Sequence, residues 1–306
     1  MSGLIQYSVV IPVFGAEKSL EQLHHAICGF FANRYSFEVI YVNDGSRDHS
    51  WEVLRRMKQS SENMIAVNLC KNYGQHAATI CGIKHSRGQF VITMDDDLEV
   101  HPDEIAKLIA SQTNTGSDIV YGVYPKLNQS FLRAMLTSVY KLLAKTEGRE
   151  KGKGSSFRLM KRDLAKKLSD NHKQFVFIDE LCLWYTDKIT FLPCEPNKAF
   201  INKQRYGLSS LFSLTSTVVL FSSTFPLKLV TRIGIALSAT NLIIGCHYLF
   251  KKLFYKIPVS GYTSLIVSIL FSTGLIIFCI GIIAQYLSQI LRSVNNAPSY
   301  SESEVI

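Results

Sequence analysis

Three consecutive aspartates, Asp95, Asp96 and Asp97, follow almost directly after an apolar segment at residues 89–93. Adjacent carboxylates repel one another, and a carboxylate is rarely placed at the end of a buried strand unless it is paired or binds a cation. Mg²⁺ and Mn²⁺ bind one or two protein carboxylates and leave their other positions to water and phosphate oxygens. The residues therefore indicate a site for a divalent metal and a nucleoside diphosphate.

A solvated turn is the competing interpretation, because an acidic run more often lies at the surface without a ligand. The sequence context favours a ligand site. Open α/β sheets bind their ligands at the carboxyl ends of strands, and the aspartates follow such an end. Pro102 can then begin a helix, and Gly116 can end it.

The elements that position these aspartates alternate along the first half of the chain. Helical patterns separate four apolar segments that are typical of strands, at residues 8–12, 38–42, 65–69 and 89–93. This alternation predicts a mainly parallel sheet flanked by helices. The strand ends then bring Pro12 and Asp44 to the same edge as the aspartates. The sequence contains neither a Rossmann glycine motif nor a P-loop, so a metal is expected to neutralise the phosphate groups.

The second half of the chain has a different character, because charged residues almost disappear beyond Gly207. Residues 233–250 and 257–291 contain no charged side chain. At about 1.5 Å per residue, roughly 20 helical residues cross the ~30 Å hydrocarbon layer of a membrane. We therefore predict a transmembrane hairpin. Two buried core helices are the alternative, which the length and uniform apolarity of the second segment disfavour.

The net charge of +9 has a local cause in a basic cluster at residues 149–173. Few aromatic residues lie between the basic ones and no nucleic-acid-binding motif occurs, so no nucleic-acid partner is expected. Anionic lipid headgroups or a phosphorylated substrate fit the cluster, and a solvated basic face is the alternative. The seven cysteines show neither CxxC pairs nor a metal-ligand spacing to histidine, which predicts reduced core residues.

Five segments occur in an order that is typical of one enzyme family. They are Val-Ile-Pro-Val-Phe at 10–14, Val-Asn-Asp-Gly-Ser at 42–46, Lys-Asn-Tyr-Gly-Gln-His at 71–76, Asp-Asp-Asp-Leu-Glu at 95–99 and Val-Ser-Gly-Tyr-Thr-Ser-Leu at 259–265. Together they resemble the family-two glycosyltransferases with the A-type fold, over nearly the whole chain. The chain is most similar to the membrane-anchored branch that moves a sugar from a nucleotide to a polyprenyl phosphate.

The resemblance implies an inverting, metal-dependent transfer from a nucleotide-diphosphate sugar, with Mg²⁺ or Mn²⁺ as the cofactor. Asp95 and Asp97 would hold the metal and the adjacent ribose or diphosphate, and Glu99 could add a further metal ligand. Asp97 is expected to be the direct ligand. Asp44 would contact the nucleotide base, and Asp96 is expected at the donor site without a defined role.

Further residues would complete the two substrate sites. Pro12 and Phe14 belong to the donor side, and Arg133 and Arg158 match family arginines near the acceptor and its phosphate. Both arginines would otherwise be solvated surface residues. Their assignment, like that of the acidic residues, comes from the resemblance.

The sequence departs from the family pattern in three places. Relatives have Asn-Glu after the first segment, whereas this chain has Gly-Ala at 15–16 and offers Glu17 one place later for ribose recognition. The family's Gly-Asp-Phe-Arg becomes Ser-Ser-Phe-Arg at 155–158. The segment that carries Arg205 at the acceptor end is also altered.

The expected organisation has four parts. Residues 1–206 form the cytoplasmic nucleotide-sugar domain, and residues 207–226 form an amphipathic helix at the membrane interface. Residues 227–292 form two transmembrane helices, and residues 293–306 form a cytoplasmic tail. No signal peptide is visible before the first strand, so the soluble domain is expected to stay in the cytoplasm. The expected location is the bacterial inner membrane, as a multi-pass protein. Membrane lipids are expected partners, and a homo-oligomer is left open.

The sequence leaves three alternative functions. A hydroxyl-bearing acceptor, such as a lipid-linked sugar, would require a base, for which Asp179 or Glu180 is available. A processive polysaccharide synthase is disfavoured, because its Gln-x-x-Arg-Trp segment is absent from the sequence. A membrane-anchored scaffold without activity is disfavoured by the intact acidic residues.

Overall fold

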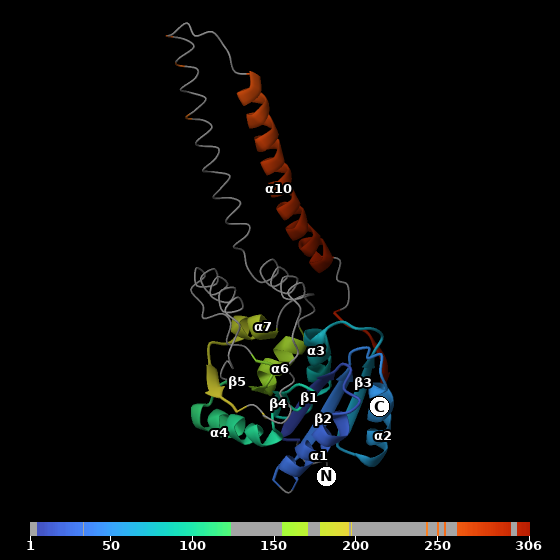
Figure 1. The fold of residues 1–306 in the computed structure, drawn as a ribbon. Helices are drawn as coiled ribbons and strands as arrows, with labels where there is room; N and C mark the ends of the chain where they lie inside the picture. Colours follow the sequence, from blue (N-terminus) through green and yellow to red (C-terminus); the bar gives the residue numbers. More distant parts are fainter. Residues whose placement is uncertain are drawn as a thin grey trace. The chain divides into compact units, whose positions relative to one another are not determined.

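The computed structural model describes residues 5–32, 34–123, 155–170, 178–195, 197, 243, 250, 254, 262–294 and 299–306. The chain divides into two compact units. The first contains Met1–Lys141, Glu147–Gln204 and Asn296–Ile306, and the second contains Leu142–Thr146 and Arg205–Asn295. All strands of the described sheet belong to the first unit (Figure 1).

The sheet contains eight strands in the order β7-β5-β6-β4-β1-β2-β3-β8. Their bounds are β1 Tyr7–Val13, β2 Phe37–Asn43, β3 Met64–Leu69, β4 Phe90–Thr93, β5 Ile119–Val123, β6 Arg158–Lys161, β7 Ile189–Pro193 and β8 Glu302–Val305. Strands β4, β1, β2 and β3 are parallel, as are β5 and β7, whereas β6 and β8 run antiparallel to their neighbours. The predicted mainly parallel sheet is confirmed.

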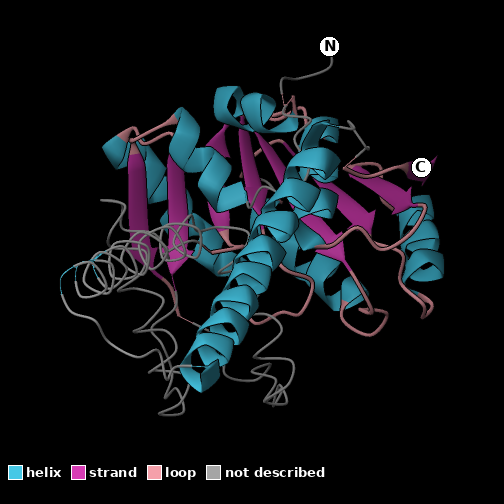
Figure 2. Cartoon of the chain, turned by 90° about the horizontal axis from the view of Figure 1, so that it is seen from above, coloured by secondary structure: helices cyan, strands magenta, loops and turns pink. Residues whose placement is uncertain are grey.

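Helices cover both faces of this sheet (Figure 2). Every residue of β1 is buried, because the strand lies between β4 and β2. Val9 and Ile11 pack with apolar residues of helices α1, α2 and α4, whereas Val10 packs on the other face with residues of α3, α6 and α7. The helices are α1 Leu20–Phe31, α2 Ser50–Ser60, α3 Gln75–His85, α4 Ile105–Thr115, α6 Arg162–Ser169 and α7 Ile178–Tyr185, with a short 3-10 helix, η1, at Pro102–Glu104.

The end of the chain forms a strand that the sequence did not predict. Residues 293–306 were expected to be a tail, but β8 pairs antiparallel with β3. The backbone of Ile306 makes two hydrogen bonds of 2.9 Å with Ala66, and the Ser303 hydroxyl donates to the carbonyl of Asn68 at 3.0 Å. Backbone pairing at an edge needs no apolar pattern, so the sequence Ser-Glu-Ser-Glu-Val gave no strand signal.

The second unit contains α10, Tyr262–Val294, onto which most of the second predicted span falls. The predicted interfacial helix at 207–226 lies outside the described residues, as does the first predicted span except for Ile243 and Phe250. Counted over the residues whose placement is described, no helix is long and apolar enough to cross a membrane. The two-helix hairpin is therefore not confirmed and stays a prediction.

Candidate active site

The acidic segment, residues 95–99, follows strand β4, which lies next to β1 at the centre of the sheet. The Met94 N–H donates to the carbonyl of Val10 at 3.2 Å, so the chain follows β1 for one residue beyond β4. Met94 is buried, Asp95 and Asp96 are half-buried, and Asp97 is exposed. The three carboxylates therefore have different surroundings, although they are consecutive in the sequence.

Asp96 ties the acidic segment to the loop after β1. One of its carboxylate oxygens, Oδ2, accepts the Phe14 N–H at 2.9 Å, and its carbonyl accepts the Ser19 hydroxyl at 2.7 Å. Burial raises the pKa of Asp96 to about 6; the bond from Phe14 opposes this rise, and the charges of Asp95 and Asp97 add to it. The surroundings of Asp96 thus stabilise its neutral form more than its charged form.

This raised pKa predicts a pH dependence of stability in the metal-free protein. The folded state retains the Asp96 proton up to about pH 6, whereas the unfolded chain loses it near pH 4, so this group's contribution to stability falls as the pH rises between those values. Asp96→Asn keeps an acceptor for Phe14 and removes the titration. In EDTA, we expect the variant to be more stable than the wild type by about 2 kcal/mol at pH 7.

Urea unfolding of both proteins at pH 4, 5, 6 and 7 measures this difference, and comparing the two proteins cancels the contributions of titrating groups that are distant from Asp96. The difference should shrink towards zero at pH 4. A difference that does not vary with pH would contradict the assignment to Asp96.

Asp95 is held by two polar side chains from other parts of the chain. The Gln75 amide at the start of α3 donates to Oδ1, and the Ser156 hydroxyl, just before β6, donates to Oδ2. Burial raises the pKa of Asp95; the bond from Ser156 opposes this rise, and the charge of Asp97 adds to it. The Asp95 carboxylate is therefore fixed in position, and a nearby cation would relieve its repulsion with Asp97.

Asp97 and Glu99 lie on either side of a turn that leaves Asp97 in solvent. Leu98 has φ 59°, a left-handed conformation that costs a residue with a side chain about 1 kcal/mol or more. Its side chain is 3% exposed within the core, and burial of this kind offsets that cost. The Glu99 N–H donates to Asp97 Oδ1 at 3.0 Å, and Glu99 is half-buried. Asp97 is thus the most accessible carboxylate of the three aspartates.

Asp44 directly follows β2, and its carboxylate binds the backbone of a neighbouring loop. It is 3% exposed, and its two carboxylate oxygens accept the N–H groups of Tyr73 at 2.7 Å and Gly74 at 2.8 Å. Burial raises the pKa of the Asp44 carboxyl, and the two backbone bonds act in the opposite direction. Asp44 therefore shapes the loop that leads into α3 and places Gln75 beside Asp95. Contact between Asp44 and a base stays a prediction.

The turn after Asp44 leaves no room for a side chain. Gly45 has φ +66°, and a Cβ built on it would lie 2.6 Å from the backbone nitrogen of Asn72. We expect Gly45→Ala to lower the free energy of unfolding by about 2–4 kcal/mol, because the loop must shift away from Asp44.

Gly116→Ala is the matched control, because Gly116 has φ +64° and no atom within 4 Å of a built Cβ. Its loss should be about 1 kcal/mol, as measured by urea unfolding. Equal losses in the two variants would show that the contact with Asn72 has no effect.

The predicted donor residues of the first loop lie at the same edge. Pro12 is buried within β1, whereas the Phe14 side chain is 57% exposed and its N–H contacts Asp96. Glu17 accepts the His49 N–H at 3.1 Å, and its own N–H donates to Asp48 at 3.3 Å. Glu17 thus joins the loop after β1 to the segment after β2, and an exposed aromatic ring lies next to the acidic segment.

The Arg158 side chain lies inside the protein. It is 3% exposed, its Nε donates to the Thr93 hydroxyl at 3.0 Å, and its Nη1 pairs with Asp179. Burial alone would lower the pKa of Arg158, but the Asp179 charge raises it. In this structure Arg158 therefore stabilises the end of β4 through its hydrogen bond to Thr93. The expected role of Arg158 at the acceptor phosphate stays untested, and Arg133 and Arg205 lie outside the described residues.

The expected metal ligands do not form a closed cage. In the part of the chain that the structure describes, the one group of three metal-binding side chains whose ligand atoms all lie within 4.8 Å of one another is elsewhere, at Cys81, His85 and Glu302. Asp95 and Asp97 nevertheless fit Mg²⁺ or Mn²⁺, which need only one or two carboxylates when phosphate oxygens and water supply the other ligands.

A family model described as "Glycosyl transferase family 2" matches residues 8–179, which is more than half of the chain and covers the strands from β1 to β6 except the first residue of β1. The chain belongs to glycosyltransferase family 2. The match covers the β1 loop, Asp44, the acidic segment and Arg158, and it ends at Asp179. The chain is therefore a glycosyltransferase, and its acidic edge is the candidate active site.

Relatives of this glycosyltransferase match over nearly their whole length. A prophage-derived bactoprenol glucosyl transferase of Shigella flexneri is 28% identical over 97% of both chains. The undecaprenyl-phosphate 4-deoxy-4-formamido-L-arabinose transferase of Salmonella paratyphi A is also 28% identical, over 98% of this chain and 93% of its own. The names of both relatives describe transfer to a polyprenyl carrier.

Solved structures support the A-type fold of this glycosyltransferase. The glucosyl-3-phosphoglycerate synthase of Mycobacterium tuberculosis in complex with UDP has a TM-score of 0.53 at 17% identity, covering 71% of this chain and 78% of its own. The same enzyme with Mn²⁺, UDP-glucose and glycerol 3-phosphate has a TM-score of 0.50 at 18% identity, with the same coverage.

Two contacts of the glycosyltransferase site were missed by reasoning from the sequence. Gln75 and Ser156 bind Asp95 from segments that lie 20 and 61 residues away. Neither residue type signals catalysis alone. The signal for Ser156 was its position in the family's Gly-Asp-Phe-Arg segment, where a hydroxyl replaces a carboxylate. The hydroxyl donates a hydrogen bond to Asp95, whereas another carboxylate would add repulsion.

Proposed function

We propose that this glycosyltransferase moves a sugar from a nucleoside diphosphate to a polyprenyl phosphate, with Mg²⁺ or Mn²⁺ bound by Asp95 and Asp97 and with inversion at the anomeric carbon. The observation that carries the proposal is the pair of carboxylates at the carboxyl end of β4, one fixed and half-buried and the other exposed. The names of the relatives support the acceptor. The manganese complex of the mycobacterial enzyme supports the cofactor.

The residues around the acidic segment have separate roles in this proposal. When bound, the metal would neutralise negative charge on the departing nucleoside diphosphate. Gln75 and Ser156 hold Asp95 in one orientation, and the turn at Leu98 keeps Asp97 accessible. Asp96 fixes the loop that carries Phe14, whose exposed ring is available to pack against the base or the sugar.

The state of Asp179 favours a phosphate acceptor. A phosphate monoester has a second pKa of about 6, so near neutrality it is already anionic and needs no strong base. A hydroxyl acceptor would need one, and the carboxylate expected for that role pairs with the buried Arg158. The side chain of Glu180 lies outside the described part of the structure.

A lipid acceptor implies that the enzyme acts at a membrane. We propose that it acts at the cytoplasmic face of a bacterial inner membrane. Helix α10 supports this location, because its apolar side chains are more than half exposed at Leu265, Ile276, Ile280 and Leu287. Exposed apolar side chains along a helix indicate contact with an apolar environment such as the interior of a membrane. The predicted interfacial helix belongs to the same proposal.

Product analysis tests the function. The purified full-length protein is incubated with Mg²⁺ or Mn²⁺, a panel of nucleotide sugars and one of three acceptors: a polyprenyl phosphate, the corresponding polyprenol, or a lipid-linked sugar. We expect a sugar-phosphate-polyprenol, identified by its mass, with the first acceptor. A glycoside formed only with a hydroxyl acceptor would overturn the proposed acceptor, and failure to bind any nucleotide sugar in Mn²⁺ would overturn the proposed activity.

A further inference from the structure

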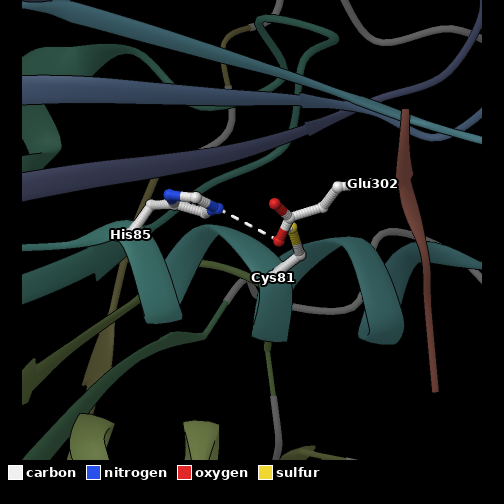
Figure 3. Close-up of side chains that lie close together, drawn as sticks. All are labelled: Cys81, His85 and Glu302. Atoms are coloured by element: carbon white, nitrogen blue, oxygen red, sulfur yellow. Dashed lines mark hydrogen bonds and ion pairs between the residues drawn. The ribbon is translucent and has the colours of Figure 1, made fainter. Parts of the chain in front are cut away.

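A second cluster of metal-binding side chains lies between α3 and β8. Cys81 and His85 are four residues apart on α3 and so share one face of the helix, while Glu302 reaches them from β8 (Figure 3). The sequence offered no reason to join them, because Glu302 is 221 residues from Cys81. The expectation that no cysteine has a metal-ligand spacing to histidine is wrong for this pair.

The distances in the cluster suit one small metal ion. Cys81 Sγ lies 3.5 Å and His85 Nε2 lies 3.1 Å from the same oxygen, Glu302 Oε1. Zinc bonds of about 2.3 Å to sulfur and about 2.0–2.2 Å to nitrogen and oxygen, at tetrahedral angles, place ligand atoms about 3.3–3.6 Å apart. Two of the three separations are therefore close to those that a tetrahedral zinc ion requires, and the third, between the ligand atoms of Cys81 and His85, is within 4.8 Å.

The chemistry of the three groups also fits zinc. A thiolate and a carboxylate together balance the two positive charges of the ion, and thiolate with imidazole selects Zn²⁺ over Mg²⁺. Cys81 is fully buried, whereas the side chains of His85 and Glu302 are 25% and 26% exposed. Water can reach the exposed side of the cluster and provide the fourth ligand of a three-residue site.

We propose that Cys81, His85 and Glu302 bind a zinc ion that fastens the C-terminal strand β8 to helix α3. The ion would cross-link the last residues of the chain to a central helix of the first unit. The first residue of α3 is Gln75, which contacts Asp95, so the ion would also hold the helix that positions this carboxylate. The zinc site does not depend on the proposed function.

Cobalt substitution tests the site, because a thiolate bound to Co²⁺ gives a charge-transfer absorption that carboxylates do not. The purified full-length protein is stripped with a chelator and titrated with Co²⁺ and then Zn²⁺ in excess Mg²⁺, which occupies carboxylate sites. We expect one Co²⁺ per chain with a thiolate band that Zn²⁺ abolishes. Cys81→Ser should lose the band and bind Zn²⁺ about 10–100-fold more weakly.

Cys28→Ser is the matched control. Cys28 also lies four residues from a histidine, with its Sγ 3.5 Å from His24 Nε2, but the ligand atoms of that pair do not join a described cluster of three. This variant should keep the band and the affinity. Absence of the band in the wild type, or an equal band in Cys81→Ser, would show a hydrogen-bonded cluster only and overturn the proposal.

Thermal unfolding keeps the test valid if a variant folds poorly. At about a hundredfold excess of Zn²⁺ over its Kd, the wild-type Tm should rise by roughly 5–10 °C. Glu302→Gln keeps the size of the side chain and removes its charge, and its Tm should rise by much less. An equal rise in both proteins would place the zinc elsewhere and overturn the assignment.

Discussion

Replacing Asp97 with asparagine is expected to lower kcat/KM for sugar transfer by about 10²–10³-fold, equivalent to about 3–4 kcal/mol of transition-state stabilisation. Asp97 is the exposed carboxylate of the acidic segment, and it accepts a hydrogen bond from the N–H of Glu99 in the same turn. Losing its charge weakens the hold on the metal that stabilises the leaving diphosphate. The measurement is the rate of glycolipid formation at saturating Mn²⁺.

Asp103→Asn is the control for this variant. Asp103 is another exposed aspartate, six residues further on, with a side chain that is 75% exposed and paired with His101. Its substitution should leave the rate within about twofold, and neither change should alter the free energy of unfolding by more than about 0.5 kcal/mol. Full metal-dependent transfer by the Asp97 variant would exclude Asp97 as a ligand.

Asp179→Asn is expected to lower the free energy of unfolding by about 3–5 kcal/mol, although Asp179 itself is 36% exposed. The loss arises at its partner, because the Arg158 guanidinium is 3% exposed and would lose its ion pair while keeping a hydrogen bond to Thr93 and a contact with the Tyr121 ring. Urea unfolding measures the loss, and a change below about 1 kcal/mol would show that the pair contributes little.

The double variant Arg158→Met/Asp179→Leu separates structural support from a role as base. If Asp179 only neutralises Arg158, replacing both charges together should restore most of the stability and much of the transfer. A base cannot be restored in this way. Recovered stability without activity would therefore show that one of the two charges takes part in transfer, either Asp179 as a base or Arg158 at the acceptor phosphate.

The sheet and the position of the acidic segment could be predicted from the sequence because their signals are local. Alternating strands and helices in residues 8–93 specify parallel strands, and the carboxyl ends of such strands lie at one edge. The prediction that Pro12, Asp44 and the three aspartates lie at one edge of the sheet therefore agrees with the structure. Strand β8 was not predicted, because it is an edge strand whose pairing depends on backbone groups of β3.

The roles of individual residues were harder to predict, because they depend on partners that are distant in the sequence. Asp44 is bound by Tyr73 and Gly74, which a motif at residues 42–46 cannot reveal. Arg158 resembles a phosphate ligand in sequence, but the structure buries its side chain and places Asp179 beside it. The role of Ser156 depends on the hydrogen bond from its hydroxyl to Asp95, which the sequence alone does not reveal.

The most direct test of the acidic segment as a metal-nucleotide site is Mn²⁺ binding measured by electron paramagnetic resonance. Because the carboxylates form no closed cage, the wild-type protein should bind Mn²⁺ weakly alone and about 10–100-fold more tightly with a nucleoside diphosphate, which supplies the missing oxygen ligands. The variant Asp95→Asn/Asp97→Asn should lose this gain. An equal gain in the variant, or no gain in the wild type with any nucleoside diphosphate, would contradict the site.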